Sequence, residues 1–198
     1  YPYKERAAVK KIVMDLSTLF RSVAKTMFAE AKIVADKFHV IRVVINSLEN
    51  VRKRIQKEFH ATKRKWFKRS RYLLLKPEYK LTSEDKTELA RMLNSSYDLE
   101  KAYVLKERFY EVFRKQTRTE AKKELGNWLL LAADLSLPEF RHCITTFSNW
   151  KTEIANIIGE RVSNGFIEGS NNKIKVLKRI SYGVQNFDRF RNRILYLQ

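Results

Sequence analysis

The sequence predicts a mainly α-helical protein with a small parallel β portion near its amino end. Five glycines and three prolines among 198 residues are few, which favours long helices over a turn-rich β architecture. Hydrophobic residues at 44% and aromatic residues at 12% suffice for a packed core. Two short apolar runs within the first 36 residues each end at an aspartate, as buried strands do.

The charge balance is strongly basic and indicates a polyanionic partner. Lysine plus arginine number 41 against 22 acids, a net charge of +19, and such a surface attracts nucleic acid or anionic membrane. No apolar run is long enough to span a bilayer and no signal peptide opens the chain, so we expect nucleic acid and no membrane. The single cysteine, Cys143, excludes an internal disulfide and a cysteine zinc cluster. We expect it to be a small buried residue of an intracellular protein.

The first 36 residues predict a strand, a helix and a second strand. Residues 9–14 form a short apolar run that stops at Asp15, and Lys32–Ala35 stops at Asp36. Ser17 can cap the helix between them. The apolar positions of that helix are Leu19, Phe20, Val23, Ala24, Met27 and Phe28. Strands joined this way are parallel, so both aspartates lie at strand carboxyl ends, where α/β proteins place their sites.

The basic segment at residues 51–80 is the candidate nucleic-acid surface. It holds twelve lysines and arginines against Glu58 and Glu78, and Trp66, Phe67 and Tyr72 lie among them. Such a mixture suits a surface that binds phosphates and stacks on bases, although a solvated helix with inward aromatics gives the same pattern. The predicted DNA contacts in this segment are Arg52, Arg54, Lys63, Arg64, Lys65, Lys68 and Arg69.

Four further helices are expected over residues 83–94, 97–116, 119–134 and 137–158. Ser136 with Glu139 predicts a capping box at the start of the last one, with Pro138 in its first turn. Aromatic residues of these helices are expected to form a core rather than a ligand site. We expect three regions: residues 1–59 with the βαβ unit and a long helix, a helical insertion at 60–160, and 161–198.

Residues 163–175 begin with an Asn-Gly turn and lead into a helix expected over 166–180. Glu168 is unusual there, because residues 161–198 hold eight lysines and arginines but only two acids, Glu168 and Asp188. A carboxylate kept in such surroundings suggests a metal or phosphate partner. A helix-dipole contact by an acid near a helix start explains it equally well. A break at 181–183 precedes a last amphipathic helix.

Asp15, Asp36 and Glu168, with His39 three residues after Asp36, form the candidate site. Carboxylates with few histidines suit Mg²⁺ or Mn²⁺ rather than zinc, and two such ions support phosphoryl transfer. The residues therefore indicate nuclease-type or strand-transfer chemistry on DNA. A non-catalytic helical nucleic-acid-binding protein with structural acids stays open as the alternative.

Four segments together carry a family resemblance. They are residues 12–17 (IVMDLS), 31–40 (AKIVADKFHV), 163–175 (SNGFIEGSNNKIK) and the pattern Arg179-x-x-Tyr182-Gly183-x-x-Asn186-Phe187. They resemble the ISL-three family of bacterial insertion-sequence transposases. The resemblance implies a partial RNase H-like α/β core with a large helical insertion and an Asp-Asp-Glu metal triad. On it, Asp15 matches the second aspartate and Glu168 the final glutamate, both as catalytic metal ligands. Asp36 and His39 match a supporting Asp-x-x-His signature.

The resemblance also implies a partner, and it implies that the metal site is incomplete. DNA, as terminal inverted repeats and target, is the expected partner of a nucleoid-associated bacterial cytoplasmic protein, and a homodimer stays open. Asn172 is expected to support Glu168, and further DNA contacts are expected from Lys173, Lys175, Lys178 and Arg179. The family's first aspartate has no counterpart here, so we expect a catalytic fragment that is inactive alone. A degenerate transposase remnant is a further alternative.

Overall fold

The computed structural model describes residues 2–160 and 165–196, without the side chains of residues 166–168. The chain divides into two compact units, Tyr1–Arg161 and Val162–Gln198. In the first unit, strands β1 (Lys11–Met14) and β2 (Lys32–Ala35) pair in parallel, with Lys11 opposite Lys32 and Met14 opposite Ala35. The predicted parallel pair is thus confirmed. Helix α1 (Tyr3–Ala8), which the sequence did not predict, precedes it.

Helix α2 (Thr18–Met27) connects the two strands. The side chain of Ser17 accepts the Phe20 N–H, which confirms the predicted cap. The apolar positions of α2 are not buried as a group. Ala24 is buried, whereas Leu19, Phe20, Val23 and Met27 are between 42% and 69% exposed. The described sheet has two strands, which is too narrow a surface to cover the whole apolar side of the helix.

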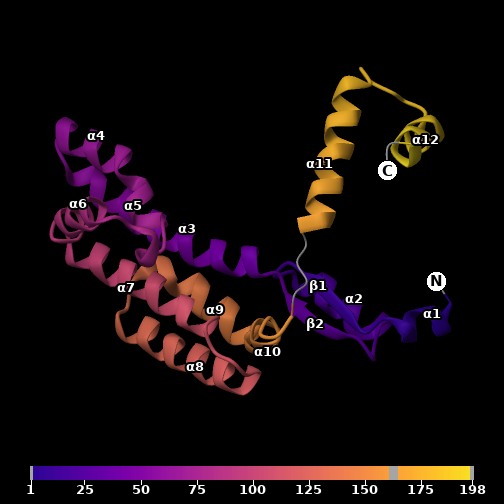
Figure 1. Cartoon of the computed structure of the whole chain (residues 1–198), viewed down its shortest axis with the longest axis horizontal. Coiled ribbons are helices and arrows are strands. Elements are labelled where there is room, and N and C mark those ends of the chain that lie inside the picture. The colour runs from indigo at the N-terminus through magenta and orange to yellow at the C-terminus, as the bar shows by residue number, and fades with distance from the viewer. Residues whose placement is uncertain (1, 161–164, 197–198) are drawn as a thin grey trace. The chain divides into compact units, whose positions relative to one another are not determined.

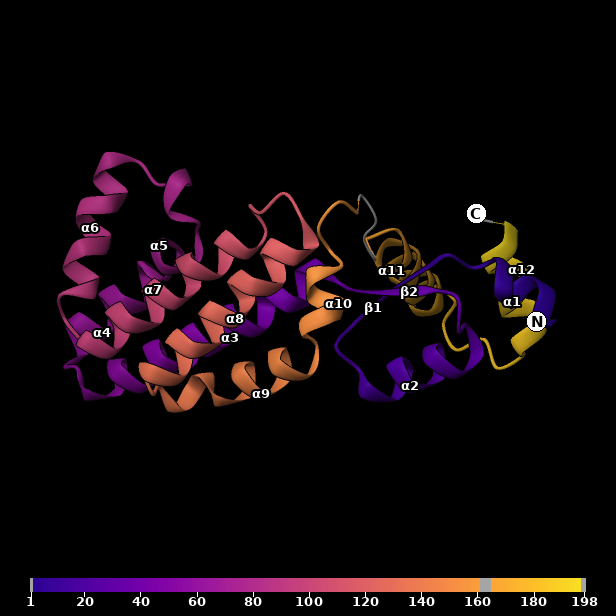
Figure 2. The ribbon, with the colours of Figure 1, turned by 90° about the horizontal axis from the view of Figure 1, so that it is seen from below.

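Helix α3 (Lys37–Ile55) is the central element of the first unit, and its residues Val40, Val44, Leu48 and Val51 are buried. Figures 1 and 2 show the two strands at one end of α3 and helices α4 to α6 at the other. Beside α3 lie α7 (Tyr97–Val112) and α9 (Arg141–Asn149), and α8 (Arg118–Asp134) packs against α7 and α9. At its far end are η1 (Gln56–Glu58), α4 (Ala61–Arg69), α5 (Arg71–Leu75), η2 (Glu78–Lys80) and α6 (Ser83–Leu93).

An aromatic cluster forms the centre of the helical core, as predicted. The Phe109 ring lies 5.0 Å from the rings of Trp128 and Phe147, measured between centroids. Phe140 completes the cluster beside Trp128, whose indole N–H donates to the Leu105 carbonyl at 2.8 Å. Cys143 is buried in the same core, where its Sγ lies 3.2 Å from Ser47 Oγ.

The helix predicted over residues 137–158 is wrong in two respects. The segment is divided into η3 (Pro138–Phe140), α9 and α10 (Lys151–Ala155), with a break at Trp150. Ser136 does not form the predicted capping box, because it ends α8 with a positive φ of 53° and donates to the Ala133 carbonyl. Glu139 pairs with Arg54 instead, at 2.6 Å. Capping boxes form at Thr82 with Asp85 and at Thr117 with Glu120.

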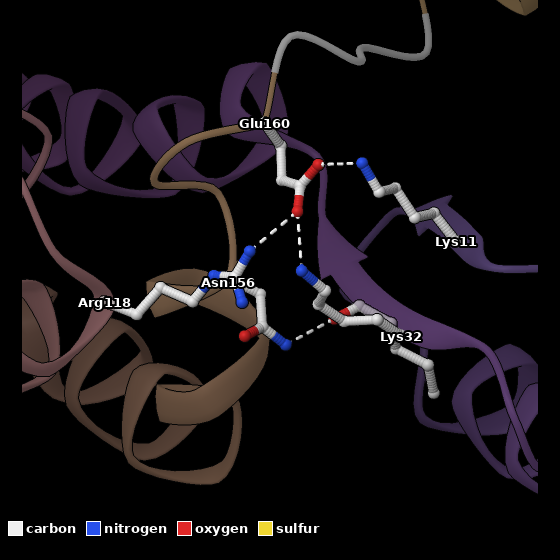
Figure 3. A network of polar contacts seen from close by, with 6 residues as sticks. Lys11, Lys32, Arg118, Asn156 and Glu160 are labelled. Carbon is white, nitrogen blue, oxygen red and sulfur yellow. Dashed lines mark hydrogen bonds and ion pairs between the residues drawn. The ribbon is translucent and has the colours of Figure 1, made fainter.

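An ion cluster around Glu160 ties the amino ends of both strands to the helical layer (Figure 3). Its carboxylate lies 2.6 Å from the ammonium groups of Lys11 and Lys32 and 2.9 Å from the Arg118 guanidinium. Hydrogen bonds from the two lysines lower the pKa of Glu160 to about 2. Asn156 adds a hydrogen bond to the Ile33 carbonyl at 2.8 Å. The cluster fixes the sheet on the helical layer.

The second unit contains helices α11 (Gly165–Ile180) and α12 (Phe187–Tyr196). The predicted break between them is confirmed, since Tyr182 and Gly183 both have positive φ angles, 47° and 86°. Leu177 is buried within this unit. Among the described residues of both units, no helix is long and apolar enough to cross a membrane.

Candidate metal site and DNA-binding residues

The two aspartates follow neighbouring strands and lie together for that reason. Asp15 comes directly after β1, and Asp36 comes directly after β2. The register places Met14 opposite Ala35, and the Asp36 N–H donates to the Met14 carbonyl at 2.7 Å. The chain turns into α3 at Asp36, whose side chain caps that helix by accepting the His39 N–H at 3.0 Å.

His39 bridges the two carboxylates. Its Nδ1 lies 3.0 Å from Asp36 Oδ1 and 3.1 Å from Asp15 Oδ1. One candidate metal-ligand atom from each of the three residues lies within 4.8 Å of the others. The side chains differ in exposure: Asp36 is 3% exposed, His39 28% and Asp15 51%. The structure thus brings together three of the site residues that the sequence predicted.

The donor set of this cluster suits a divalent cation with Asp15 as the outward-facing ligand. Two carboxylates and an imidazole are ligands that Mn²⁺ accepts, and carboxylates are those that Mg²⁺ prefers. Asp36 Oδ1 already accepts from the backbone and lies beside the imidazole of His39 in a buried position. Because His39 Nδ1 lies against both carboxylates, Asp36 and His39 can together hold the Asp15 carboxylate in position.

Glu168, the other predicted metal ligand, lies on α11. Its side chain is outside the described residues, so its role stays a prediction. Asn172 follows it by four residues and Lys175 by seven, which is the spacing of one helix face. The side chains of Asn172, Lys173, Lys175, Lys178 and Arg179 are all exposed.

Two arginines of the predicted DNA surface have other partners. Arg52 is buried at 4% exposure, and its Nε donates to Glu49 at 2.8 Å while Nη1 donates to Gln56. A guanidinium so enclosed does not face solvent, so the expectation that Arg52 contacts DNA is wrong. Arg54 is paired with both Glu139 and Asp98, at 2.6 and 2.9 Å, and these carboxylates offset its charge.

Helix α4 presents a cationic surface without exposed aromatic rings. Arg64, Lys65, Lys68 and Arg69 are exposed, and within the described parts of the chain none of them forms an ion pair. Lys63 is half-buried, with its ammonium 4.0 Å from the centre of the Phe59 ring. The two aromatic residues of α4 itself pack against the core, Phe67 fully buried and Trp66 partly buried, contrary to a base-stacking surface on this helix.

Phe67 is fully buried against Phe59, and the Trp66 indole donates to Glu88. Tyr72 is 54% exposed, and its hydroxyl donates to Asp85 at 3.2 Å. Two interpretations of this segment were open: a surface that both binds phosphates and stacks on bases, and a solvated helix with inward aromatics. Helix α4 agrees with the second. Its surface suits phosphates and not bases.

Glu160 is the charged residue that sequence reasoning missed. Its three partners are separated from it by 42 to 149 residues in the chain, so no local pattern marks it. A lone acid between the buried α10 segment and the basic residues 161–198 was the only available signal.

The chain belongs to the transposases, since the family model described as "Transposase" matches residues 1–194. The family is the ISL-three family of DDE transposases, and the resemblance of the four sequence segments is thereby confirmed. DDE transposases generally use divalent metal ions, in keeping with the donor set at Asp15, Asp36 and His39.

Curated relatives include two transposases. The transposase for insertion sequence element IS1557 of Mycobacterium tuberculosis is 27% identical over 206 residues, covering 92% of this chain and 46% of the relative. The transposase for IS1001 of Bordetella parapertussis is 25% identical over 186 residues, with the same two coverages. A Lactococcus lactis protein described as an ATP-dependent protease is 35% identical over 94 residues, which is 47% of this chain and 26% of that protein.

The chain thus spans about half the length of the two transposases that it matches. No solved structure matches it.

Proposed function

We propose that this chain is the carboxy-terminal part of the catalytic region of a DDE DNA transposase. The whole protein cuts DNA at the ends of an insertion sequence and joins those ends to target DNA by two-metal phosphoryl transfer. The family match over residues 1–194 supports this function. The observation that carries it is the convergence of Asp15, Asp36 and His39 at the carboxyl ends of parallel strands. The 46% coverage of the transposase relatives supports the view that the chain is a part.

The proposed roles of Asp15, Asp36 and His39 rest on their exposure and partners, and that of Glu168 rests on the family resemblance. Asp15 and Glu168 bind metal, and Asp36 and His39 hold the Asp15 carboxylate in place. Bound Mg²⁺ or Mn²⁺ supplies the activation of a water or a 3′-hydroxyl and the stabilisation of the leaving oxygen. A partial RNase H-like core is the fold proposed around these residues.

A cleavage and joining assay with the whole transposase that carries this chain tests these roles. Asp15→Asn and Glu168→Gln each remove one charge at nearly constant volume, and each is expected to abolish cleavage while DNA affinity is kept. Asp188→Asn, an acid of α12 with no proposed role, is the matched control and is expected to leave cleavage unchanged. Full cleavage by Asp15→Asn would overturn the proposed site.

DNA is the proposed partner, bound through phosphate contacts of α4 and α11. The double variant Lys65→Ala and Lys68→Ala is expected to weaken binding and to lower the slope of log affinity against log salt. On duplex DNA the slope falls by about 0.9 for each phosphate that the protein no longer neutralises. Lys122→Ala, an exposed lysine on α8, is the control and is expected to leave the slope unchanged. An unchanged slope in the α4 variant would exclude that helix as a phosphate-binding surface.

A further inference from the structure

Tyr182, in the turn between α11 and α12, has an unusual backbone and an unusual exposure. Its φ is 47°, and Gly183 follows it with a φ of 86°. Side chains other than glycine are disfavoured in this left-handed region, and bulky ones more than asparagine or aspartate. The Tyr182 side chain is 95% exposed. A large aromatic residue is thus held at a helix end where glycine is the usual choice.

Local packing does not explain the tyrosine. Ser136, the other non-glycine residue with positive φ among those the structure describes, donates its hydroxyl to the Ala133 carbonyl and closes α8. At Tyr182 the backbone N–H reaches the Arg179 carbonyl at 3.5 Å. Within residues 2–160 and 165–196, the Tyr182 ring has no hydrogen-bond or aromatic partner. Asparagine or glycine would form the same turn more easily.

The surroundings of Tyr182 are cationic. Lys178 and Arg179 precede it on α11, Arg189 follows on α12, and all three are exposed. In the described residues none of the three forms an ion pair, and the nearby Arg193 donates to Ser181 Oγ at 3.1 Å. Asp188 is the acid of α12. An exposed ring beside several unpaired cations is the combination with which proteins bind unpaired nucleotides.

We propose that Tyr182 stacks on the base of an unpaired nucleotide in DNA that the basic α11–α12 hairpin holds by its phosphates. The inference rests on the proposed function, because the DNA is that on which the transposase acts. Unpaired bases fit better than duplex, since the faces of paired bases are already stacked on their neighbours. The aromatic residues of α4 do not compete for this role, because Phe67 is fully buried and Trp66 is partly buried against the core.

Two substitutions separate the ring from the backbone at this position. Tyr182→Asn removes the ring and keeps a residue that tolerates the left-handed region, so the turn is expected to remain. Tyr182→Trp keeps an aromatic face. Tyr97→Asn changes a tyrosine that is 69% exposed at the start of α7 and serves as the matched control. Circular dichroism checks that each variant has the parental helix content.

The assay measures binding of the chain to a short single-stranded oligonucleotide containing 2-aminopurine and to its duplex, over a range of salt. Tyr182→Asn is expected to weaken single-strand binding by about 5- to 150-fold, the effect of losing one stacked base. Duplex affinity and the salt slope are expected to stay unchanged. Tyr182→Trp is expected to bind like the parent and to quench 2-aminopurine. Arg179→Ala is expected to lower the salt slope.

The outcomes distinguish this inference from the proposed function. Single-strand affinity of Tyr182→Asn equal to that of the parent would refute stacking, while DNA binding that depends on α4 would leave the proposed function standing. Equal losses on single strand and duplex, or a changed salt slope, would assign Tyr182 a structural role or a protein partner instead. A chain that binds no DNA at any salt would overturn the DNA-binding proposal and the stacking with it.

Discussion

Replacing Asp36 by alanine tests the claim that this residue supports the candidate site from a buried position. The substitution removes two interactions of one carboxylate oxygen: the cap to the His39 N–H and the contact with the His39 ring, each at 3.0 Å. Loss of an N-cap costs about 1 kcal/mol, and loss of a hydrogen bond to a charged group costs about 1.5–3 kcal/mol. The side chain is 3% exposed, so water replaces neither. The expected loss of unfolding free energy is therefore about 2.5–4 kcal/mol.

Thermal unfolding followed by far-ultraviolet circular dichroism measures this loss. For a unit of this size each kcal/mol shifts the midpoint by about 2–4 °C, so Asp36→Ala is expected to unfold at least about 5 °C below the parent. Asp36→Asn keeps an oxygen acceptor for the cap and is expected to lose less. Asp15→Ala is the control, because its contact with His39 involves an Asp15 side chain that is 51% exposed, and such a surface contact contributes about 0–1 kcal/mol.

A midpoint for Asp36→Ala that is no lower than that of Asp15→Ala would refute this reasoning. The two aspartates would then be equivalent, and the distinction between a buried support and an outward-facing metal ligand would fail.

Two further predictions concern titratable groups of the first unit. The lysines beside Glu160 hold its pKa at about 2 against an ordinary value of 4.5, so the stability it contributes is present above about pH 4.5 and is lost as pH falls towards 2. Glu160→Gln is expected to flatten the acid limb of a plot of unfolding free energy against pH, and parallel curves for parent and variant would contradict this. Burial raises the pKa of the Cys143 thiol to about 11, so its contribution is present below about pH 9 and is lost as pH rises towards 11. A thiol reagent at about pH 8 is expected to label the folded chain far more slowly than the chain in denaturant, and equal rates would contradict the burial.

The sequence predicted those features that depend on residues close together in the chain, namely a strand and a helix cap. Lys32–Ala35 is a strand between a turn and an aspartate, and Ser17 caps α2, because each depends on residues a few positions apart. The meeting of Asp15 with Asp36 followed from one topological rule, that a strand, a crossover helix and a second strand form a parallel pair. The failure at Ser136 has the same origin. A serine three residues before a glutamate fits a capping box. In the structure, however, Ser136 ends α8, and its hydroxyl donates to the Ala133 carbonyl instead of capping the next helix.

A charge count indicates a class of partner but not the contact residues, because counting does not distinguish the faces of a helix. Arg52 and Arg54 both add to the positive charge counted in the basic segment. In the structure, however, Arg52 forms an ion pair with Glu49, and Arg54 forms ion pairs with Glu139 and Asp98. Those acids come from α3, η3 and α7, and folding alone brings the last two next to the segment. The same folding turns Trp66 and Phe67 inward and leaves α4 a surface for phosphates. The two halves of the nucleic-acid surface expected from one segment are thus assigned to different helices in our proposals: the exposed cations of α4 are proposed to contact the DNA backbone, and the exposed ring of Tyr182 is proposed to stack on a base. The contrast in salt dependence between the α4 variant and Tyr182→Asn tests this separation directly, because only the removal of a cation from a phosphate changes the slope.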